Sequence, residues 1–501
     1  MRYYITLLLL HAAASLHARP DTTWKTYYGL LHAHTMICDG SGTPAEAYAM
    51  AKAAGLHFFA VTPHNHIEAE SGAKERKDGI LIAKDPALYD GNSNITVTRK
   101  WKENGAPRSE QVTLAPLLKA AREATDAHFV ALYGQEFSTI SSGNHVNVLG
   151  TDRLLTTGNG DFRLLLQELD KRKKTDRNMA VIQLNHPDAE QDLFRRGGSP
   201  SDRSKMFNDY GIDPGDLGPH FKDWVQAMQP YTHLIEVFCG PAMAEQRQQH
   251  YRYTDNENDY FFYLTQGLHI SPSAGQDNHY RTWGTVTDAR TGIVARSLSE
   301  ATIYDALRRN RTYVTEDKNL HTALYINDSL MGAQLKAKEG SDLDISIHIR
   351  DTDEPTATYE IQVYSSPIRP QLSTAATHQK AANGLVQRST VRGNGLHRIK
   401  GVRANAFSSF CYVKVIQQDG DRSWTAPVWI NEGNVSTAAA TSTPHTATVP
   451  GAAKYYWTTS SSSHVYHLAG CSAVPNIKAT NLRSGNTPPA GRTQHQCDVR
   501  K

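Results

Sequence analysis

Two histidines in the N-terminal part of the chain have a spacing suited to metal binding. His32 and His34 stand one residue apart, directly after the apolar run at residues 27–31. Because side chains alternate along a strand, a strand here would direct both imidazoles to the same side, close enough to share one ion. Imidazole is the commonest protein ligand for metal ions. The spacing therefore predicts one part of a metal site.

The residues that follow predict the elements that position these histidines. Helix formers at 44–54 come after Thr43, a good helix cap, and begin with Pro44, which suits the first turn of a helix. A second apolar run at 58–62 leads to His64. A strand, a helix and a strand in such close succession predict a parallel crossover unit. In α/β folds the functional side chains follow the carboxyl ends of such strands.

The same pairing of an apolar run with a polar side chain recurs further along. A single histidine is usually a surface residue or a hydrogen-bonded core residue, so the recurrence is what favours a shared site. One carboxylate or imidazole beside each run is hard to explain by solvation alone. The residues of this kind are Glu136 after the run 129–133, His145 before the run 146–149, His186 after the run 180–184, and Asp277 and His279 after the run 269–274.

Taken together, these motifs resemble the PHP (polymerase and histidinol phosphatase) superfamily of metal-dependent phosphoesterases. They occur in the family's order, and the resemblance covers residues 27–320. Each motif is short, and their combination carries the signal. The motifs are His32-x-His34, Cys38-Asp39-Gly40, Thr62-Pro63-His64-Asn65, Gly134-Gln135-Glu136, Gly143-Asn144-His145, Asn185-His186-Pro187 and Gln276-Asp277-x-His279.

The resemblance implies an α/β fold, a distorted (β/α)7 PHP-type barrel, with two or three divalent ions at the carboxyl ends of its strands. It implies catalytic roles for Glu136, His145 and Asp277. The implied ligand sets are His32, His34, Glu136 and Asp277 for one ion, Glu136, His145 and His186 for a second, and Asp39, His64 and His279 for a third.

Two positions depart from the family pattern. The residue before His64 is usually Asp and is Pro63 here, which removes a carboxylate from behind the ligand. The residue before Asp39 is usually Ser and is Cys38, whose thiol either coordinates or only packs. Neither change affects an implied ligand.

The ligand types indicate which metals to expect and how they would act. Mixed imidazole and carboxylate sets suit Zn²⁺, Mn²⁺ or Fe²⁺ better than Mg²⁺ or Ca²⁺, which prefer oxygen ligands. Two ions that share Glu136 would make a bridging water a nucleophile and would bind phosphoryl oxygens. The sequence contains no Gly-x-Ser-x-Gly turn and no phosphate-binding Walker loop, so we expect no serine nucleophile.

The first residues have the pattern of a secretory signal. Residues 1–18 contain Arg2, an apolar stretch at 5–10 and small residues before the expected cleavage point; a buried first element is the alternative. Beyond them no apolar run approaches the length of a membrane span. We therefore expect a secreted or periplasmic protein with no transmembrane segment in the mature chain.

Length and composition agree with an exported metal enzyme of several domains. A chain of 501 residues predicts two to four domains, and a net charge of +3 is too small to indicate nucleic-acid binding by itself. Twenty-three histidines against five cysteines favour metal binding over a disulfide scaffold.

The expected domains are a signal peptide at 1–18, the barrel at 24–320, a β-sandwich-like domain at 321–431, a flexible linker at 432–453 and a small Cys/His module at 454–501. The sandwich is predicted from short alternating runs separated by Asn-Asp, Asp-Gly and Gly-Asn turns. It resembles the sheet domain of some secreted PHP proteins through the turn at 327–332 and the run at 424–429. The predicted strands are 323–326, 343–349, 359–364, 410–417 and 423–430.

The basic tail contains Ser462-x-x-x-Tyr466-His467-x-x-x-Cys471 followed by Cys497, and through these residues it resembles the Cys/His module of some secreted nucleases. Its Cys471 and Cys497 either bind zinc together with histidines or form a disulfide, and export favours the disulfide. Two polar insertions, 67–111 and 189–221, are too long for ordinary loops. The first suggests a lid or a mobile insertion, and the arginines of the second suggest surface charge more than an anion clamp.

Three functions are compatible with these patterns. The first is a secreted phosphoesterase that acts on phosphomonoesters or phosphodiesters, including nucleotides or nucleic acid. The second is a metallohydrolase of another bond type that uses the same cluster. The third is a non-catalytic envelope protein with structural metals, which the shared ligand sets argue against because structural sites are usually closed.

Overall fold

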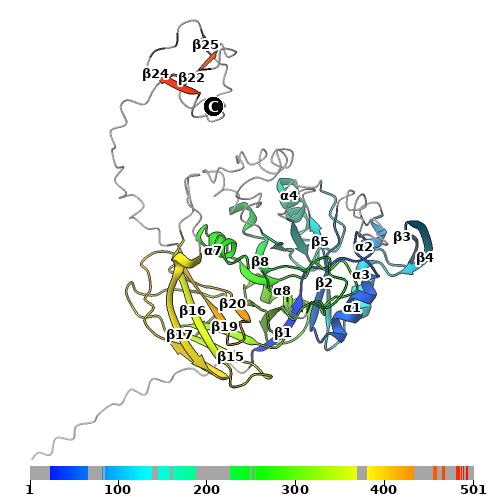
Figure 1. Cartoon of the computed structure of the whole chain (residues 1–501), viewed down its shortest axis with the longest axis horizontal. Coiled ribbons are helices and arrows are strands. Elements are labelled where there is room, and N and C mark those ends of the chain that lie inside the picture. Colours follow the sequence, from blue (N-terminus) through cyan, green and yellow to red (C-terminus); the bar gives the residue numbers. More distant parts are fainter. Residues whose placement is uncertain are drawn as a thin grey trace, which may run out of the picture. The chain divides into compact units, whose positions relative to one another are not determined.

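The computed structural model describes most of the chain between residues 23 and 433 and parts of the tail (Figure 1). The chain divides into two compact units, Met1–Val435 and Ser436–Lys501. The predicted signal segment 1–18, nearly all of the predicted linker, the insertion 189–221 and both Cys471 and Cys497 lie outside the described residues. The described residues are 23–65, 82, 85–137, 145–157, 162–187, 226–248, 251–253, 255–368, 381–433, 455–459, 465–468, 481–485, 487, 489 and 492–494.

The first crossover unit has the predicted form. Strand β1 (Lys25–Leu30), helix α1 (Pro44–Ala53) and strand β2 (Phe58–Val61) follow one another, and β1 pairs with β2 in parallel. Thr43 caps α1, because its hydroxyl accepts a hydrogen bond from the Glu46 N–H at 3.2 Å and its own N–H donates to the Glu46 carboxylate at 2.7 Å. Gly29 is required in β1, since a Cβ there would overlap Phe58.

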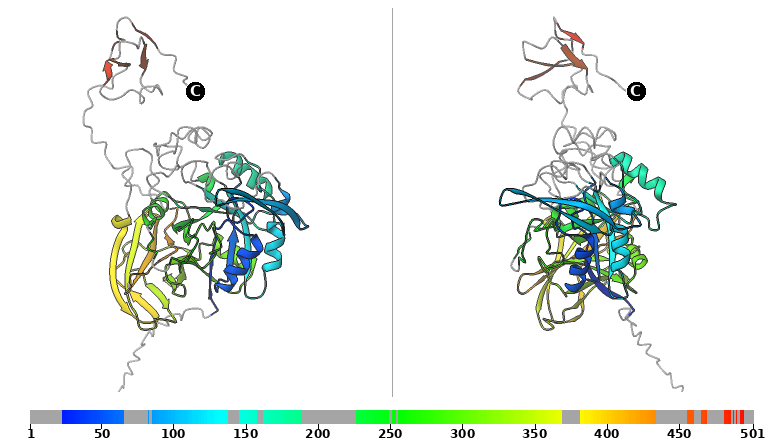
Figure 2. Two further views of the ribbon diagram at one scale, coloured as in Figure 1. Left: turned by 45° about the vertical axis from the view of Figure 1, so that its right-hand side comes forward. Right: turned by 90° about the vertical axis from the view of Figure 1, so that its right-hand side faces the viewer.

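A long curled sheet passes through the first unit (Figure 2). Its strand order includes β11-β10-β1-β2-β5-β6-β7-β8-β9. The pairs β2–β5, β7–β8 and β8–β9 are parallel, whereas β1–β10, β5–β6 and β6–β7 are antiparallel. The added strands are β5 (Val130–Phe137), β6 (Val146–Leu149), β7 (Val181–Leu184), β8 (Thr232–Phe238), β9 (Ser271–Ala274), β10 (Arg290–Ala295) and β11 (Thr312–Thr315).

The fold is therefore mixed α/β, with a sheet that contains both parallel and antiparallel pairs, and the distorted (β/α)7 PHP-type barrel stays a prediction. Strands β5 and β6 are separated by residues 138–145 alone, fewer than a parallel crossover needs, which accounts for the antiparallel pairing of these two strands. None of the helices in the described ranges is both long and apolar enough to cross a membrane. Those helices are α1, α2 (Ala87–Asp90), α3 (Leu117–Ala124), α4 (Phe162–Arg172), α7 (Glu257–Thr265) and α8 (Glu300–Arg308).

The predicted insertion 67–111 contains regular structure that sequence reasoning missed. Strands β3 (Ile95–Glu103) and β4 (Ala106–Leu114) form a separate two-stranded hairpin, at the right of Figure 1. Asn104 and Gly105 make its turn with φ values of 50° and 79°, the left-handed backbone that favours these two residue types.

The strands predicted within 321–431 are present, with the run 423–430 divided into β20 and β21, and the described residues add β13, β14, β17 and β18. Their pairings are antiparallel except that of β14 with β21, which is parallel. One sheet has four strands in the order β13-β12-β15-β18, and β16 pairs with β17 and β19. A buried apolar cluster joins β12 and β15 to β16 and β19. The elements are β12 (His321–Ile326), β13 (Ser329–Leu330), β14 (Gln334–Leu335), β15 (Ile345–Arg350), β16 (Thr358–Pro367), η3 (Ala381–Gly384), β17 (Leu385–Arg392), β18 (Gly395–Ile399), β19 (Ser409–Gln417), β20 (Arg422–Thr425) and β21 (Val428–Ile430).

These strands continue the long sheet across the predicted boundary at residue 320. Strand β20 pairs with β11, with Val314 opposite Trp424. Lys414 on β19 also forms a buried ion pair with Glu257 at the start of α7, at 2.9 Å. The C-terminal strands are thus joined to the preceding part by backbone pairing and by a buried charge pair.

The second unit contains one small sheet. Its order is β24-β22-β23-β25, formed by β22 (Tyr455–Thr458), β23 (Val465–Leu468), β24 (Leu482–Gly485) and β25 (Thr493–Gln494). The zinc and disulfide alternatives for Cys471 and Cys497 remain predictions, since both cysteines lie outside the described residues.

Candidate metal centre

The structure brings all nine predicted ligands into one connected cluster. His32 and His34 follow β1, His64 follows β2, and Glu136 lies near the end of β5. The remaining members come from the loops around β1, β6, β7 and β9, and they are Asp39, His145, His186, Asp277 and His279. Their ring nitrogens and carboxylate oxygens approach one another at 2.9–3.8 Å.

One group in this cluster has the spacing of a coordination shell. The Nε2 atoms of His32 and His34 lie 3.3 Å apart, and both face Asp277 Oδ1, at 3.1 and 2.9 Å. Glu136 lies 3.2 Å from His32 Nε2 and 3.3 Å from His34 Nε2. Ligands about 2.0–2.1 Å from a tetrahedral ion are separated by roughly 3.3 Å, so these four side chains fit one ion.

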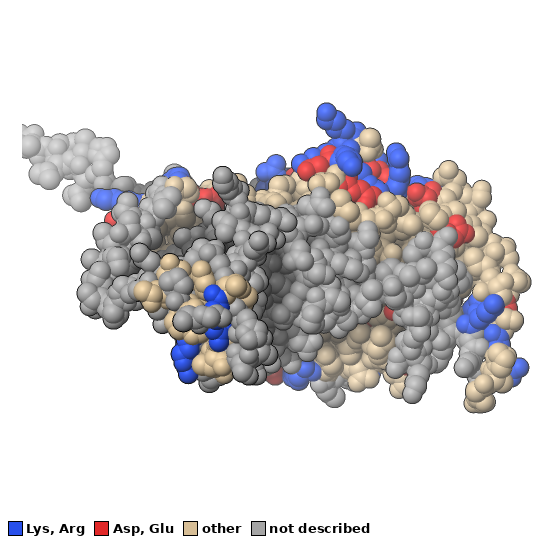
Figure 3. All heavy atoms as spheres, turned by 90° about the horizontal axis from the view of Figure 1, so that it is seen from above, with Lys and Arg blue, Asp and Glu red and all other residues tan. Residues whose placement is uncertain are grey.

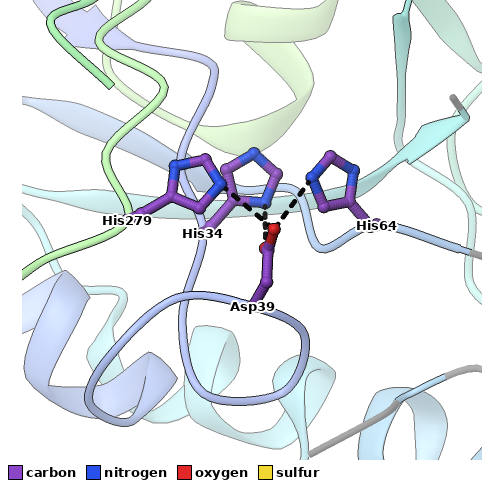
Figure 4. A group of neighbouring side chains, drawn as sticks. All are labelled: His34, Asp39, His64 and His279. Atoms are coloured by element: carbon purple, nitrogen blue, oxygen red, sulfur yellow. Dashed lines mark ion pairs between the residues drawn. The ribbon is translucent and has the colours of Figure 1, made fainter. Parts of the chain in front are cut away.

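A second group surrounds Asp39 (Figure 4). Asp39 Oδ2 lies 3.4 Å from Nε2 of both His64 and His279, and Oδ1 lies 3.7 Å from His34 Nδ1. The ring of His34 stacks between the other two rings, with centroids 4.3 Å from His64 and 4.2 Å from His279. His34 therefore presents one ring nitrogen to each of the first two groups.

The third group differs in one member from the set implied by the resemblance. Glu136, His145 and His64 lie within ligand distance of one another, with Glu136 oxygens 3.0 Å from His145 Nδ1 and 2.9 Å from His64 Nδ1. His186 approaches the same carboxylate less closely, with Nε2 3.4 Å from Oε1. Glu136 is therefore shared by two of the groups.

The donor atoms fit a cation by their chemistry. Glu136 Oε2 and Asp277 Oδ1 are buried without a geometrically acceptable hydrogen bond, although imidazole nitrogens lie 2.9 Å from each. The nitrogens and oxygens are thus close but not aimed along donor–acceptor lines. Imidazole nitrogens and hard carboxylate oxygens at these separations suit a divalent transition metal.

Electrostatics inside the cluster keep its carboxyl groups ionised. Burial by itself would raise the pKa of Glu136, but His145 and His32 hold it well below its usual range. The pKa of Asp277 is lowered in the same way, by His32 against the effect of burial. A buried set of ionised carboxylates is stabilised by positive charge, from protons on the imidazoles or from metal ions.

The cluster is closed on one side and accessible on the other. The side chains of His32 and His34 are fully buried, and that of Glu136 is 1% exposed. His186, His145 and Asp277 are 27%, 20% and 16% exposed. These three side chains therefore form the accessible side of the cluster.

The two departures from the family pattern have structural roles here. The Pro63 carbonyl accepts a hydrogen bond from the Glu136 N–H at 3.0 Å, and this backbone hydrogen bond joins the ends of β2 and β5. The Cys38 thiol is buried 3.4 Å from His34 Nδ1, and burial raises its pKa well above the usual value. The thiol therefore packs against the His34 imidazole.

Sequence reasoning missed Glu236 and Cys239. Glu236 lies within β8, fully buried, and its Oε1 atom is 2.9 Å from His32 Nδ1. Cys239 lies within ligand distance of both residues. The signal that could have identified Glu236 was a single acidic residue inside the apolar run Leu234, Ile235, Val237 and Phe238.

The surface charge visible around the molecule is mixed. On the face seen in Figure 3, the described residues include one region where Lys and Arg lie among Asp and Glu, and smaller groups of Lys and Arg elsewhere. This agrees with the small net charge of +3.

No family model matches the chain, and no curated protein matches it. Among solved structures, it is similar to a two-domain protein from Bacteroides vulgatus described as containing a predicted PHP-like metal-dependent phosphoesterase, with 12% identity, a TM-score of 0.37, and coverage of 81% of this chain and 96% of that one. It is also similar to the PmoD soluble domain from Methylocystis, with 13% identity, a TM-score of 0.16, and coverage of 22% and 90%. With TM-scores below 0.5, these similarities do not establish a common fold.

Proposed function

We propose that the protein is an exported metal-dependent phosphoesterase that hydrolyses phosphomonoesters or phosphodiesters with a metal-activated water. The observation that carries the proposal is the sharing of ligands. Glu136, whose carboxylate has two oxygens, belongs to two groups able to hold an ion. Shared ligands and partly exposed members are typical of catalytic multinuclear sites, whereas structural sites are closed.

Each predicted ligand has a defined part in this proposal. His32 and His34 hold the buried side of the cluster, and Glu136 spans neighbouring groups with its two oxygens. Bound divalent ions would lower the pKa of a water and stabilise negative charge on the phosphoryl oxygens. His145 and Asp277, together with His186, would contact the substrate side.

The motif resemblance described above supports phosphate esters over other substrates, and the apolar first segment supports export. Nucleotides and nucleic acid are the substrates that the tail's resemblance to a nuclease module favours. The metals that fit the donor set best are Zn²⁺, Mn²⁺ and Fe²⁺.

The test combines metal analysis with a substrate panel on one preparation. We expect two or three divalent ions per chain, and release of phosphate or p-nitrophenol from monoesters or diesters. Hydrolysis confined to carboxylic esters, amides or lactones would assign the cluster to another bond type. Bound metal without hydrolysis of any member would support the non-catalytic alternative and overturn the proposal.

A further inference from the structure

Glu236 is the charged group nearest to the cluster that the proposed function does not use. Its side chain is fully buried, and both carboxylate oxygens are engaged by donors from three places. Oε1 lies 2.9 Å from His32 Nδ1 and accepts a hydrogen bond from Gln183 Nε2 at 3.1 Å. Oε2 accepts from the backbone N–H of His186 at 2.6 Å.

The contact with His32 determines which ring nitrogen faces the ion. A carboxylate only accepts hydrogen bonds, so the proton of neutral His32 is held on Nδ1. The other nitrogen, Nε2, then carries a free lone pair toward Asp277 and Glu136. A carboxylate behind a metal-binding imidazole fixes both its tautomer and the orientation of its ring.

The contact with His186 acts on the backbone. His186 has a φ of 25°, a conformation that a non-glycine residue adopts at an energetic cost. The short hydrogen bond from its N–H to Glu236 stabilises this turn directly after β7, from which the imidazole reaches Glu136.

A chain of side-chain amides extends the same support to Glu136. Gln183 donates to Glu236 and also to Asn185 Oδ1, at 3.1 Å in both cases. Asn185 donates from Nδ2 to Glu136 Oε1 at 3.0 Å. Gly275 leaves room for this arrangement, because a Cβ at that position would overlap the Glu236 carboxylate.

We propose that Glu236 is a positioning residue of the metal centre, which orients His32 directly, His186 through its backbone and Glu136 through two amides. The inference rests on the proposed function only in that the cluster holds metal ions. The Glu236 side chain acts through the metal ligands that it contacts, His32 and His186.

The alternative role for Glu236 is that of a ligand in a separate metal site. His32, Glu236 and Cys239 lie close enough to hold an ion of their own. We favour positioning because three donors already occupy the two oxygens of Glu236, and an ion would have to displace at least one of them.

The test is the substitution Glu236→Gln. Glutamine has the same size but places an NH₂ group among three donors. At least one of the donors on His32, Gln183 and His186 therefore loses its acceptor. The matched control is Glu257→Gln, which removes another buried carboxylate, one paired with Lys414 away from the cluster. Cys239→Ser tests the separate-ion alternative.

The measurement is Zn²⁺ affinity by competition with a chromophoric chelator, together with the visible spectrum of the Co²⁺-loaded protein. We expect 10–100-fold weaker Zn²⁺ binding and an altered Co²⁺ spectrum for Glu236→Gln. For Glu257→Gln we expect an affinity within about twofold of the wild type. If Glu236→Gln does not fold, Glu236→Asp, which keeps the charge but is too short to reach all three donors, is expected to bind Zn²⁺ at least about tenfold more weakly.

Equal affinities for the Glu236 and Glu257 variants would overturn the proposal. Loss of one bound ion in both Glu236→Gln and Cys239→Ser would overturn it in favour of a separate site. Metal affinity is measured without substrate. The outcome of this test therefore does not depend on whether the wild type hydrolyses phosphate esters.

Discussion

Glu136 Oε2 lies 2.9 Å from His64 Nδ1, and an isolated backbone bridge joins the same two residues where β2 and β5 end. This contact brings together residues from two parallel strands. It also makes Glu136 the central acid of the cluster, since its other oxygen approaches His145.

Replacing Glu136 with Gln is expected to reduce kcat by several orders of magnitude while leaving the fold intact. The amide removes the negative charge that two groups share, and its NH₂ group cannot bind an ion. The check is hydrolysis of p-nitrophenyl phosphate esters, with circular dichroism for the fold. Glu110→Gln, on the exposed hairpin, serves as the control. A Glu136 variant with near wild-type rates would remove this residue from the site.

Removal of metal is expected to destabilise the protein. Ions that bind the folded cluster and not the unfolded chain stabilise the native state, and their removal takes this contribution away. Metal at about 100 times its dissociation constant contributes about 2.7 kcal/mol, so we expect a lower Tm after dialysis against a chelator. Restoring Zn²⁺ or Mn²⁺ should recover the original Tm, and a Tm that never depended on metal would contradict the prediction.

Stability should also fall below neutral pH because of His321, which is remote from the cluster's ligands. Burial, with His348 and Arg350, lowers the pKa of His321 from 6.5 to about 3. Between pH 3 and pH 6.5 the unfolded chain therefore binds more protons than the folded chain. The contribution of neutral His321 to the free energy of unfolding is complete above about pH 6.5 and is lost as the pH falls toward 3.

The variant His321→Asn keeps an acceptor for the Thr26 hydroxyl but does not titrate. Its free energy of unfolding should fall less than that of the wild type between pH 7.5 and pH 5, with a difference on the order of 1 kcal/mol. His128→Asn, at an exposed position, is the control and should behave like the wild type. Identical pH profiles for the wild type and the His321 variant would exclude this linkage.

Deleting everything after Asn434 is expected to leave hydrolysis of a small phosphoester within about twofold of the full chain. All nine predicted ligands lie upstream, and the chain divides into compact units next to this position. Hydrolysis of nucleic acid at low salt should fall, because the tail carries basic residues that raise the local concentration of a polyanion. Equal losses on both substrates would show that the tail belongs to the catalytic unit.

The mature chain is expected to begin near Arg19 and to be found outside the cytoplasm. Residues 1–18 have the charge, apolar core and small residues of a cleaved signal. N-terminal sequencing of the native exported protein decides this, and recovery of Met1 would contradict it.

Local patterns in the sequence determined much of this protein. The capping box of α1 was predictable because Thr43 and Glu46 interact within one turn. The pairing of His32 with His34 was predictable because side chains alternate along a strand, and the resemblance implied that Asp277 joins them. Both the cap and the histidine pair depend on spacing along the chain.

Tertiary structure alone decided what depends on pairing between distant segments. The contact between His32 and Glu236 joins residues 204 positions apart, and no local pattern distinguishes a buried acid that orients a ligand from one that pairs with a lysine. The same limit applies to the third group, in which His64 lies 2.9 Å from the Glu136 carboxylate and His186 lies 3.4 Å from it. Periodicity specifies which face of a strand is buried, but strand order and register depend on the packing of the whole sheet.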